Sequence, residues 1–192
     1  MVGLDKPNIG LLSPEFMEDV ANLEEKNLAV DLLERLLRDE VKARMKIDVV
    51  SEKKYSDRIL ETLRKYHNRA IETAQVIEEL IKMAKDMAED ADLAEKSGLN
   101  PDEIAFYRAL IQNESAVKEL GDNNLRELAK HVTAQLRKST TVDWQVRDSV
   151  RAKLRNLVRR ALRKWRYPPD RADEAVELCL KQAEALSERW SN

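Results

Sequence analysis

Apolar residues recur at intervals of three and four along most of this chain, and this spacing constrains the fold more than any other feature. It is the period of a helix that buries one face. No segment alternates apolar and polar residues for long enough to form a sheet, and no unit of about 20 to 50 residues repeats as in a solenoid. The sequence therefore predicts an all-α fold, a multi-helix bundle of about six to eight helices.

The most regular run predicts one long helix at the centre of that bundle. Positions from Leu60 to Ala91 alternate steps of three and four, as in the seam of a coiled coil. A helix unbroken from Ser56 to Leu93 is about 55 Å long at a rise of about 1.5 Å per residue. His67 falls within the seam, so we expect a packed, hydrogen-bonded histidine and not a metal ligand.

Local signals place other helices. A second amphipathic helix is expected over residues 28–45, where apolar and charged positions alternate in the same way. A capping residue followed by proline predicts helix starts at Ser13 and Asn100, because proline is favoured at the first helical position. Gly121 is expected to end a helix.

The order of these elements predicts the domain organisation. Residues 1–12 show no periodicity and are expected to be a linker. Residues 13–192 are expected to form a single helical domain. Its N-terminal part, 13–96, holds the long helix, and its C-terminal part, 100–192, holds a strongly basic helix.

The last two helices are expected over residues 143–166 and 170–190, divided by Tyr167-Pro168-Pro169. The β-branched run Thr140-Thr141-Val142 marks a loop or short extended connector before them.

The near-neutral balance of 34 Lys and Arg against 36 Asp and Glu conceals a strong asymmetry. Acidic residues predominate over 86–127, and basic residues predominate over 147–171. On a helical wheel, the apolar side chains of the basic helix fall in one sector and the basic side chains lie opposite them. These basic side chains are the candidate partner-binding or DNA-binding residues: Arg147, Arg151, Arg155, Arg159, Arg160, Arg163, Lys164 and Arg166.

Two interpretations of this basic face remain open from the residues alone. Because the arginine fork suits phosphate and carboxylate alike, the face could bind a polyanion or an acidic protein surface. Alternatively, it is a solvated face that the acidic segment 86–127 neutralises within the fold.

Several kinds of chemistry are excluded by composition. The four glycines are scattered, so no phosphate-binding loop is formed. The single Cys179 excludes a disulfide framework and indicates a reducing compartment, and we expect it to be a buried, inert thiol. No apolar run is long enough to span a membrane, so no membrane contact and a cytoplasmic location are expected. We expect no catalytic residue, metal site or cofactor site.

The three tryptophans, Trp144, Trp165 and Trp190, are expected to be packing anchors and not stacking platforms for bases. Trp165 in particular falls on the apolar side of the basic helix.

Three stretches of the chain resemble the C-terminal helical region of the R subunit of type I restriction-modification enzymes. They are KNLAVDLLERLLRDEVKAR at 26–44, YHNRAIETAQVIEELI at 66–81 and VDWQVRDSVRAKLRNLVRRALRKWRYPPD at 142–170. The opening residues, from Leu4 to Ser13, also resemble the connector that leaves the preceding motor domain in such subunits. The resemblance covers nearly the whole chain.

This resemblance implies a parent polypeptide with a nuclease domain and two helicase-like ATPase domains that translocate double-stranded DNA. ATP and magnesium would then be bound by those other domains, and the present chain would be a non-catalytic fragment. The implied partners are the other domains of the same R subunit and the methyltransferase and specificity subunits. No catalytic residue of the family maps onto this chain.

The sequence thus favours a docking domain whose arginines meet an acidic protein surface. One alternative is non-sequence-specific contact between the same arginines and the DNA backbone during translocation. A third is a stand-alone helical adaptor, or a coiled-coil dimer formed through the seam from Leu60 to Ala91.

Overall fold

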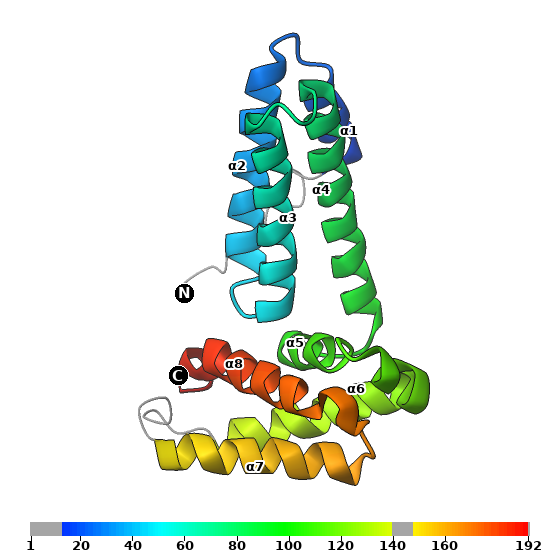
Figure 1. Cartoon of the computed structure of the whole chain (residues 1–192), viewed down its shortest axis with the longest axis vertical. Coiled ribbons are helices and arrows are strands. Elements are labelled where there is room, and N and C mark those ends of the chain that lie inside the picture. The colour runs from blue at the N-terminus through cyan, green and yellow to red at the C-terminus, as the bar shows by residue number, and fades with distance from the viewer. Residues whose placement is uncertain (1–12, 140–147, 192) are drawn as a thin grey trace, which may run out of the picture. The chain divides into compact units, whose positions relative to one another are not determined.

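The computed structural model of the chain describes residues 13–139 and 148–191. Within these residues it contains eight α-helices and no strand, so the predicted all-α, multi-helix class is confirmed. The helices, shown in Figure 1, are α1 (Pro14–Ala21), α2 (Lys26–Arg44), α3 (Val49–His67), α4 (Thr73–Lys96), α5 (Pro101–Leu110), α6 (Glu114–Ser139), α7 (Asp148–Lys164) and α8 (Ala172–Ser191), with a 3₁₀ helix, η2 (Pro169–Arg171), before α8. The predicted linker 1–12, the loop at 140–142 and a helix start at Asp143 lie outside the described residues.

The chain forms two compact units, each with its own hydrophobic core. The first unit comprises the residues up to 46 together with 51–96. The second comprises the short segment 47–50 together with the residues from 97 onward. Helices α1, α2, α4 and most of α3 therefore belong to the first unit, and α5 to α8 belong to the second.

The core of the first unit forms where the apolar faces of its helices meet. α2 packs along α4, and α1 contacts both helices. Leu33 and Leu37 of α2 are fully buried, as are Leu80 and Met83 of α4. The predicted amphipathic helix over 28–45 is confirmed, since α2 occupies this range and buries its apolar face.

Three predicted helix boundaries are confirmed by their local geometry. Ser13 caps α1, and its Oγ accepts a hydrogen bond from the Phe16 N–H at 3.2 Å. Asn100 and Glu103 form a reciprocal capping box at the start of α5. Gly121 interrupts α6 with φ 73° and ψ 165°, a conformation that is essentially restricted to glycine.

The prediction of one long helix from 56 to 93 is wrong. The chain instead folds back between α3 and α4, which run antiparallel in Figure 1. Ion pairs between the two helices fix this pairing: Lys54 Nζ lies 2.9 Å from Asp90 Oδ2, and Arg58 Nη1 lies 2.7 Å from Asp86 Oδ2. The seam pattern therefore describes two neighbouring helices and not one.

The break is caused by a backbone cap at the end of α3. Arg69 adopts a left-handed conformation with φ 55°. Its N–H donates to the Tyr66 carbonyl at 2.9 Å, and the Ala70 N–H donates to the Lys65 carbonyl at 2.8 Å. These two bonds are those of a Schellman motif, which ends a helix. His67 is exposed beside this cap, so the prediction of a packed histidine is also wrong.

Replacing Arg69 with glycine is expected to stabilise the chain. An L-residue in the left-handed conformation costs about 1 kcal/mol or more, and glycine avoids this cost. We expect Arg69→Gly to raise the free energy of unfolding in urea by about 0.5–1 kcal/mol. The matched control, Arg64→Gly inside α3, makes the same change of charge and should lower it by about 1 kcal/mol. Equal effects of the two variants would contradict this account.

In the second unit, Trp190 anchors the end of α8 to α5. Trp190 stacks on the buried Phe106 of α5 with ring centroids 6.2 Å apart, and its Nε1–H donates to Asp102 Oδ2 at 2.7 Å. Trp165 is partly buried against the same core. The prediction that these tryptophans are packing anchors is therefore confirmed for Trp165 and Trp190, whereas Trp144 lies outside the described residues.

The segment 47–50 is held in the second unit by polar side chains. Gln182 of α8 is fully buried, and its amide accepts from the Val49 N–H at 3.1 Å and donates to the Ile47 carbonyl. The buried carboxylate of Asp48 pairs with Arg108 of α5 at 2.5 Å. The segment that joins α2 to α3 is thus fixed by α5 and α8.

Candidate partner-binding surface on helix α7

Helix α7 presents one apolar face to the core of its unit. Leu154, Val158, Ala161 and Leu162 are buried there, in the sector that the helical wheel predicts. The helix contacts α6 on one side and α8 on the other. Its remaining face, which carries most of its charge, is therefore uncovered within this unit.

The turn between α7 and α8 is pinned to the junction of α5 and α6. The Tyr167 hydroxyl donates to the Leu110 carbonyl at 2.7 Å. The Asp170 carboxylate accepts from Asn113 Nδ2 and from Ser115 Oγ, both at 3.0 Å. The bond from Asn113, followed by that from Ser115, lowers the pKa of Asp170. These contacts fix the direction of α7 and so the surface that it presents.

The predicted stripe of arginines divides into paired and unpaired members. Arg155 Nε lies 2.8 Å from Glu177 Oε1, and Arg159 Nη2 lies 2.9 Å from Asp173 Oδ1. Both acids belong to α8. One of the two open interpretations had the acidic segment 86–127 neutralise this face. Among the described residues, the acids that pair with these two arginines come from α8 instead. At about 100° per residue, Arg155 and Arg159 lie on the edge of α7 nearest α8.

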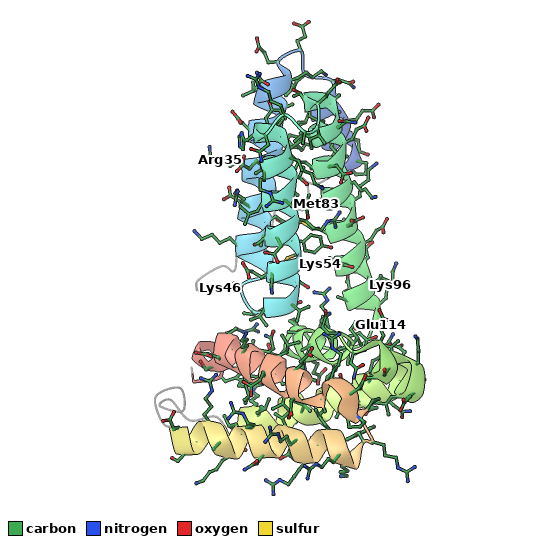
Figure 2. All side chains as sticks on the ribbon, in the orientation of Figure 1. Arg35, Lys46, Lys54, Met83, Lys96 and Glu114 are labelled. Atoms are coloured by element: carbon green, nitrogen blue, oxygen red, sulfur yellow. The ribbon has the colours of Figure 1, made fainter. Side chains whose placement is uncertain are left out.

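Several cations of α7, including the paired Arg159, line a shallow hollow along the outer face of the helix, which we call the basic groove. It has a volume of about 470 Å³, and its lining residues are Lys153, Asn156, Arg159, Arg160 and Arg163. None of the described carboxylates lines it. In Figure 2 the side chains of α7 extend away from the other helices of the unit, with nitrogen atoms at several tips. Among the described residues, no ion pair is formed by Lys153, Arg160 or Arg163.

A second hollow, between α6 and α7, adjoins the basic groove, and we call it the interhelical hollow. Its volume is about 290 Å³, and its lining residues are His131, Gln135, Leu157, Arg160, Ala161 and Lys164. Arg160 lines both hollows, so they form one continuous surface. The surface combines cations, the polar side chains of His131 and Gln135, and an apolar patch at Leu157 and Ala161.

The structure places the remaining predicted residues outside these hollows. Arg151 is half-buried on α7 and lines neither of them. Arg166 is exposed just beyond α7, where its φ of 57° ends the helix. Arg147 lies outside the described residues. The predicted set is therefore brought together only in part, with Arg159, Arg160, Arg163 and Lys164 at the hollows.

Sequence reasoning missed four residues of this surface. Lys153 and Asn156 share the outer face of α7 with Arg160, and the helical wheel could have placed them there. His131 and Gln135 come from α6, and only the tertiary packing of α6 against α7 brings them to the interhelical hollow.

Cys179 is buried in the core of the second unit, as predicted. Burial raises the pKa of its thiol to about 12, so it stays protonated and unreactive at neutral pH. Across residues 13–139 and 148–191, no group of three or more His, Cys, Asp or Glu side chains is arranged to hold a metal ion. In the same residues, no helix combines the length and apolar character needed to cross a bilayer.

The fold and this surface define a charged, all-helical domain with a cationic face on α7. Residues 1–189 match the family described as "Type I restriction enzyme HindI endonuclease subunit-like, C-terminal". The chain belongs to this family, and the resemblance seen in its sequence is confirmed.

Two relatives are informative. The type I restriction enzyme HindI endonuclease subunit of Haemophilus influenzae is 45% identical over 183 residues, which are 95% of this chain and 17% of that protein. A protein of Methanocaldococcus jannaschii described as a type I restriction enzyme MjaIXP endonuclease subunit is 29% identical over 162 residues, 81% of this chain and 15% of that protein. The chain therefore spans about one sixth of the length of these curated relatives. No solved structure matches it significantly.

Proposed function

We propose that this chain is the non-catalytic assembly domain of a type I restriction endonuclease subunit. It docks the DNA-translocating and nuclease domains of that subunit to each other and to the methyltransferase and specificity subunits. ATP and magnesium belong to the other domains, and the complex works in the cytoplasm. The observation that carries the proposal is the basic groove, because Lys153, Arg160 and Arg163, which form no ion pair among the described residues, lie on a rigidly held helix and are available to a partner.

The test is a charge reversal in the complete endonuclease subunit. The triple variant Lys153→Glu, Arg160→Glu and Arg163→Glu is expected to weaken assembly with the methyltransferase–specificity core at least tenfold, because complementary charges become like charges. Sedimentation of the purified subunits at physiological salt measures this loss. ATP hydrolysis by the free subunit should be unchanged.

A matched control separates this effect from a general change of charge. Lys53, Lys82 and Lys85 are exposed residues of α3 and α4 in the first unit, so their reversal to glutamate makes the same change of charge outside the basic groove. This control should assemble normally. If the α7 triple variant also assembles normally, the proposal is wrong.

The alternative function is contact between α7 and the DNA backbone. The arginines of the groove also suit this function, because the guanidinium fork binds phosphate. In that case the triple variant assembles but translocates poorly. A face that neutralises about six phosphates would also give DNA binding whose log–log dependence on salt has a slope near −5. Normal assembly together with a steep salt dependence would favour this function over docking.

The coiled-coil dimer has less support. Ile77 and Ala84, which belong to the predicted seam, are buried within the first unit. These side chains are therefore already covered by their own chain. Light scattering of the 192-residue chain should show a monomer.

A further inference from the structure

The continuous surface formed by the two hollows has a mixed chemistry that narrows the kind of partner. Cations dominate the basic groove, whereas the interhelical hollow adds the apolar atoms of Leu157 and Ala161 and the polar side chains of His131 and Gln135. Within residues 13–139 and 148–191, no carboxylate lines either hollow. A complementary partner therefore carries acidic groups and also at least one apolar group beside them.

The spacing of three cations on this surface suits a helical partner. Lys153, Arg160 and Lys164 are seven and four residues apart on α7, which corresponds to about 10 and 6 Å along the helix axis. A second helix that lies along α7 presents carboxylates with the same separations when they are seven and four residues apart. An apolar side chain on the same face of that helix can then reach the patch at Leu157 and Ala161.

Carboxylates at the edge of this surface disfavour the binding of a nucleic acid, because they repel its phosphates. Asp173 and Glu177 lie on the α8 side of α7, and their side chains are 84% and 45% exposed. A DNA duplex is wide, with a major groove of about 12 Å, and its charge extends over its whole surface. Bound across α7, it would approach these carboxylates. A single helix about 10 Å across can lie along the groove and avoid them.

We propose that this surface binds an acidic amphipathic helix of a partner subunit. The carboxylates of that helix meet Lys153, Arg160, Arg163 and Lys164, and an apolar side chain enters the interhelical hollow. This inference rests on the proposed assembly function and specifies the chemistry of the partner. Arg159 lines the basic groove and pairs with Asp173 of α8, and this exposed carboxylate at the edge of the site discriminates against DNA.

Site-specific photo-crosslinking in the assembled complex tests the occupant. A photoreactive amino acid replaces Gln135, which lines the interhelical hollow, and in a control it replaces Ala134, an exposed neighbour on α6 that does not line it. We expect the Gln135 position to crosslink to a partner peptide with carboxylates seven and four residues apart and an apolar residue beside them. The Ala134 position should not. A crosslink to DNA, to a segment without acidic residues, or to nothing would overturn the proposal.

A second variant tests the hollow by affinity. Gln135→Glu adds a carboxylate where the acidic helix would lie, and we expect it to weaken binding to the partner core about tenfold, since like charges oppose each other. Ala134→Glu makes nearly the same change of charge outside the hollow and should alter binding less than twofold. Equal effects of the two variants would refute this site.

These results separate the inference from the function on which it rests. If the α7 triple variant fails to assemble but Gln135→Glu and the crosslinks show no specific effect, the assembly function stands and the acidic helix is wrong. If the triple variant assembles normally, the assembly function itself fails.

Discussion

Replacement of Gln182 by leucine is expected to lower the free energy of unfolding by about 2–5 kcal/mol. The fully buried Gln182 amide satisfies two backbone groups at once, the Val49 N–H and the Ile47 carbonyl. Leucine fills a similar volume but leaves both groups without this partner, and each buried unsatisfied group costs about 1–3 kcal/mol. Urea denaturation with linear extrapolation measures the change.

Two controls make this result specific. The neighbouring Lys181 is exposed, so Lys181→Leu should change stability by less than about 0.5 kcal/mol. Gln182→Glu keeps the acceptor for Val49 but sets a carboxylate oxygen against the Ile47 carbonyl, and it should be most harmful at neutral pH. At acid pH the protonated carboxyl can donate to that carbonyl, so part of the loss should be recovered. An effect of Gln182→Leu no larger than that of Lys181→Leu would refute the bridging role.

Replacement of Arg108 by methionine is expected to cost about 2–4 kcal/mol. Its guanidinium lies 2.5 Å from the carboxylate of Asp48, whose side chain is only 7% exposed. Methionine conserves much of the packing but removes the positive charge from a buried negative one, which is more costly than the loss of a surface pair. Thermal and urea unfolding of the variant give the value.

Replacement of the partner residue, Asp48, should lower the free energy of unfolding less than Arg108→Met does. In Asp48→Asn no buried negative charge remains, and the Arg108 side chain is 22% exposed and can reach water. A surface comparison is the pair of Arg171 with Glu174, whose side chains are 52% and 62% exposed. Arg171→Met should cost less than about 1 kcal/mol. If Arg108→Met and Arg171→Met have equal effects, burial does not determine how much the pair of Arg108 with Asp48 contributes to stability.

Most of the helices could be predicted from the sequence because their apolar spacing and caps are local signals. α2 and the starts at Ser13 and Asn100 follow directly from such signals. The turn between α3 and α4 could not be predicted in this way. Its left-handed residue is Arg69, and glycine, the usual sequence mark of such a cap, is absent there. The periodicity also continues across the turn, because antiparallel helices bury the same kind of face.

Only the part of the candidate surface that lies on α7 itself could be predicted from the sequence. The wheel separates the core face of α7 from its basic face, and the structure agrees. The helical wheel cannot show that Asp173 and Glu177 pair with arginines on the α8 side of α7, because they lie 14 and 22 positions away in the sequence. It also cannot show that α6 contributes His131 and Gln135 to the surface. These features depend on how three helices pack together.

The bridge from Gln182 to the segment 47–50 also orders events during synthesis. Val49 is made 133 positions before its hydrogen-bond partner. At translation rates of about 5–20 residues per second, roughly 7–27 s separate the two on the ribosome. During that interval the junction of α2 and α3 lacks this contact, and closing so distant a contact is intrinsically slow. Helix α8 therefore completes a turn that was synthesised 133 residues earlier, so this turn cannot reach its final structure until Gln182 has been made.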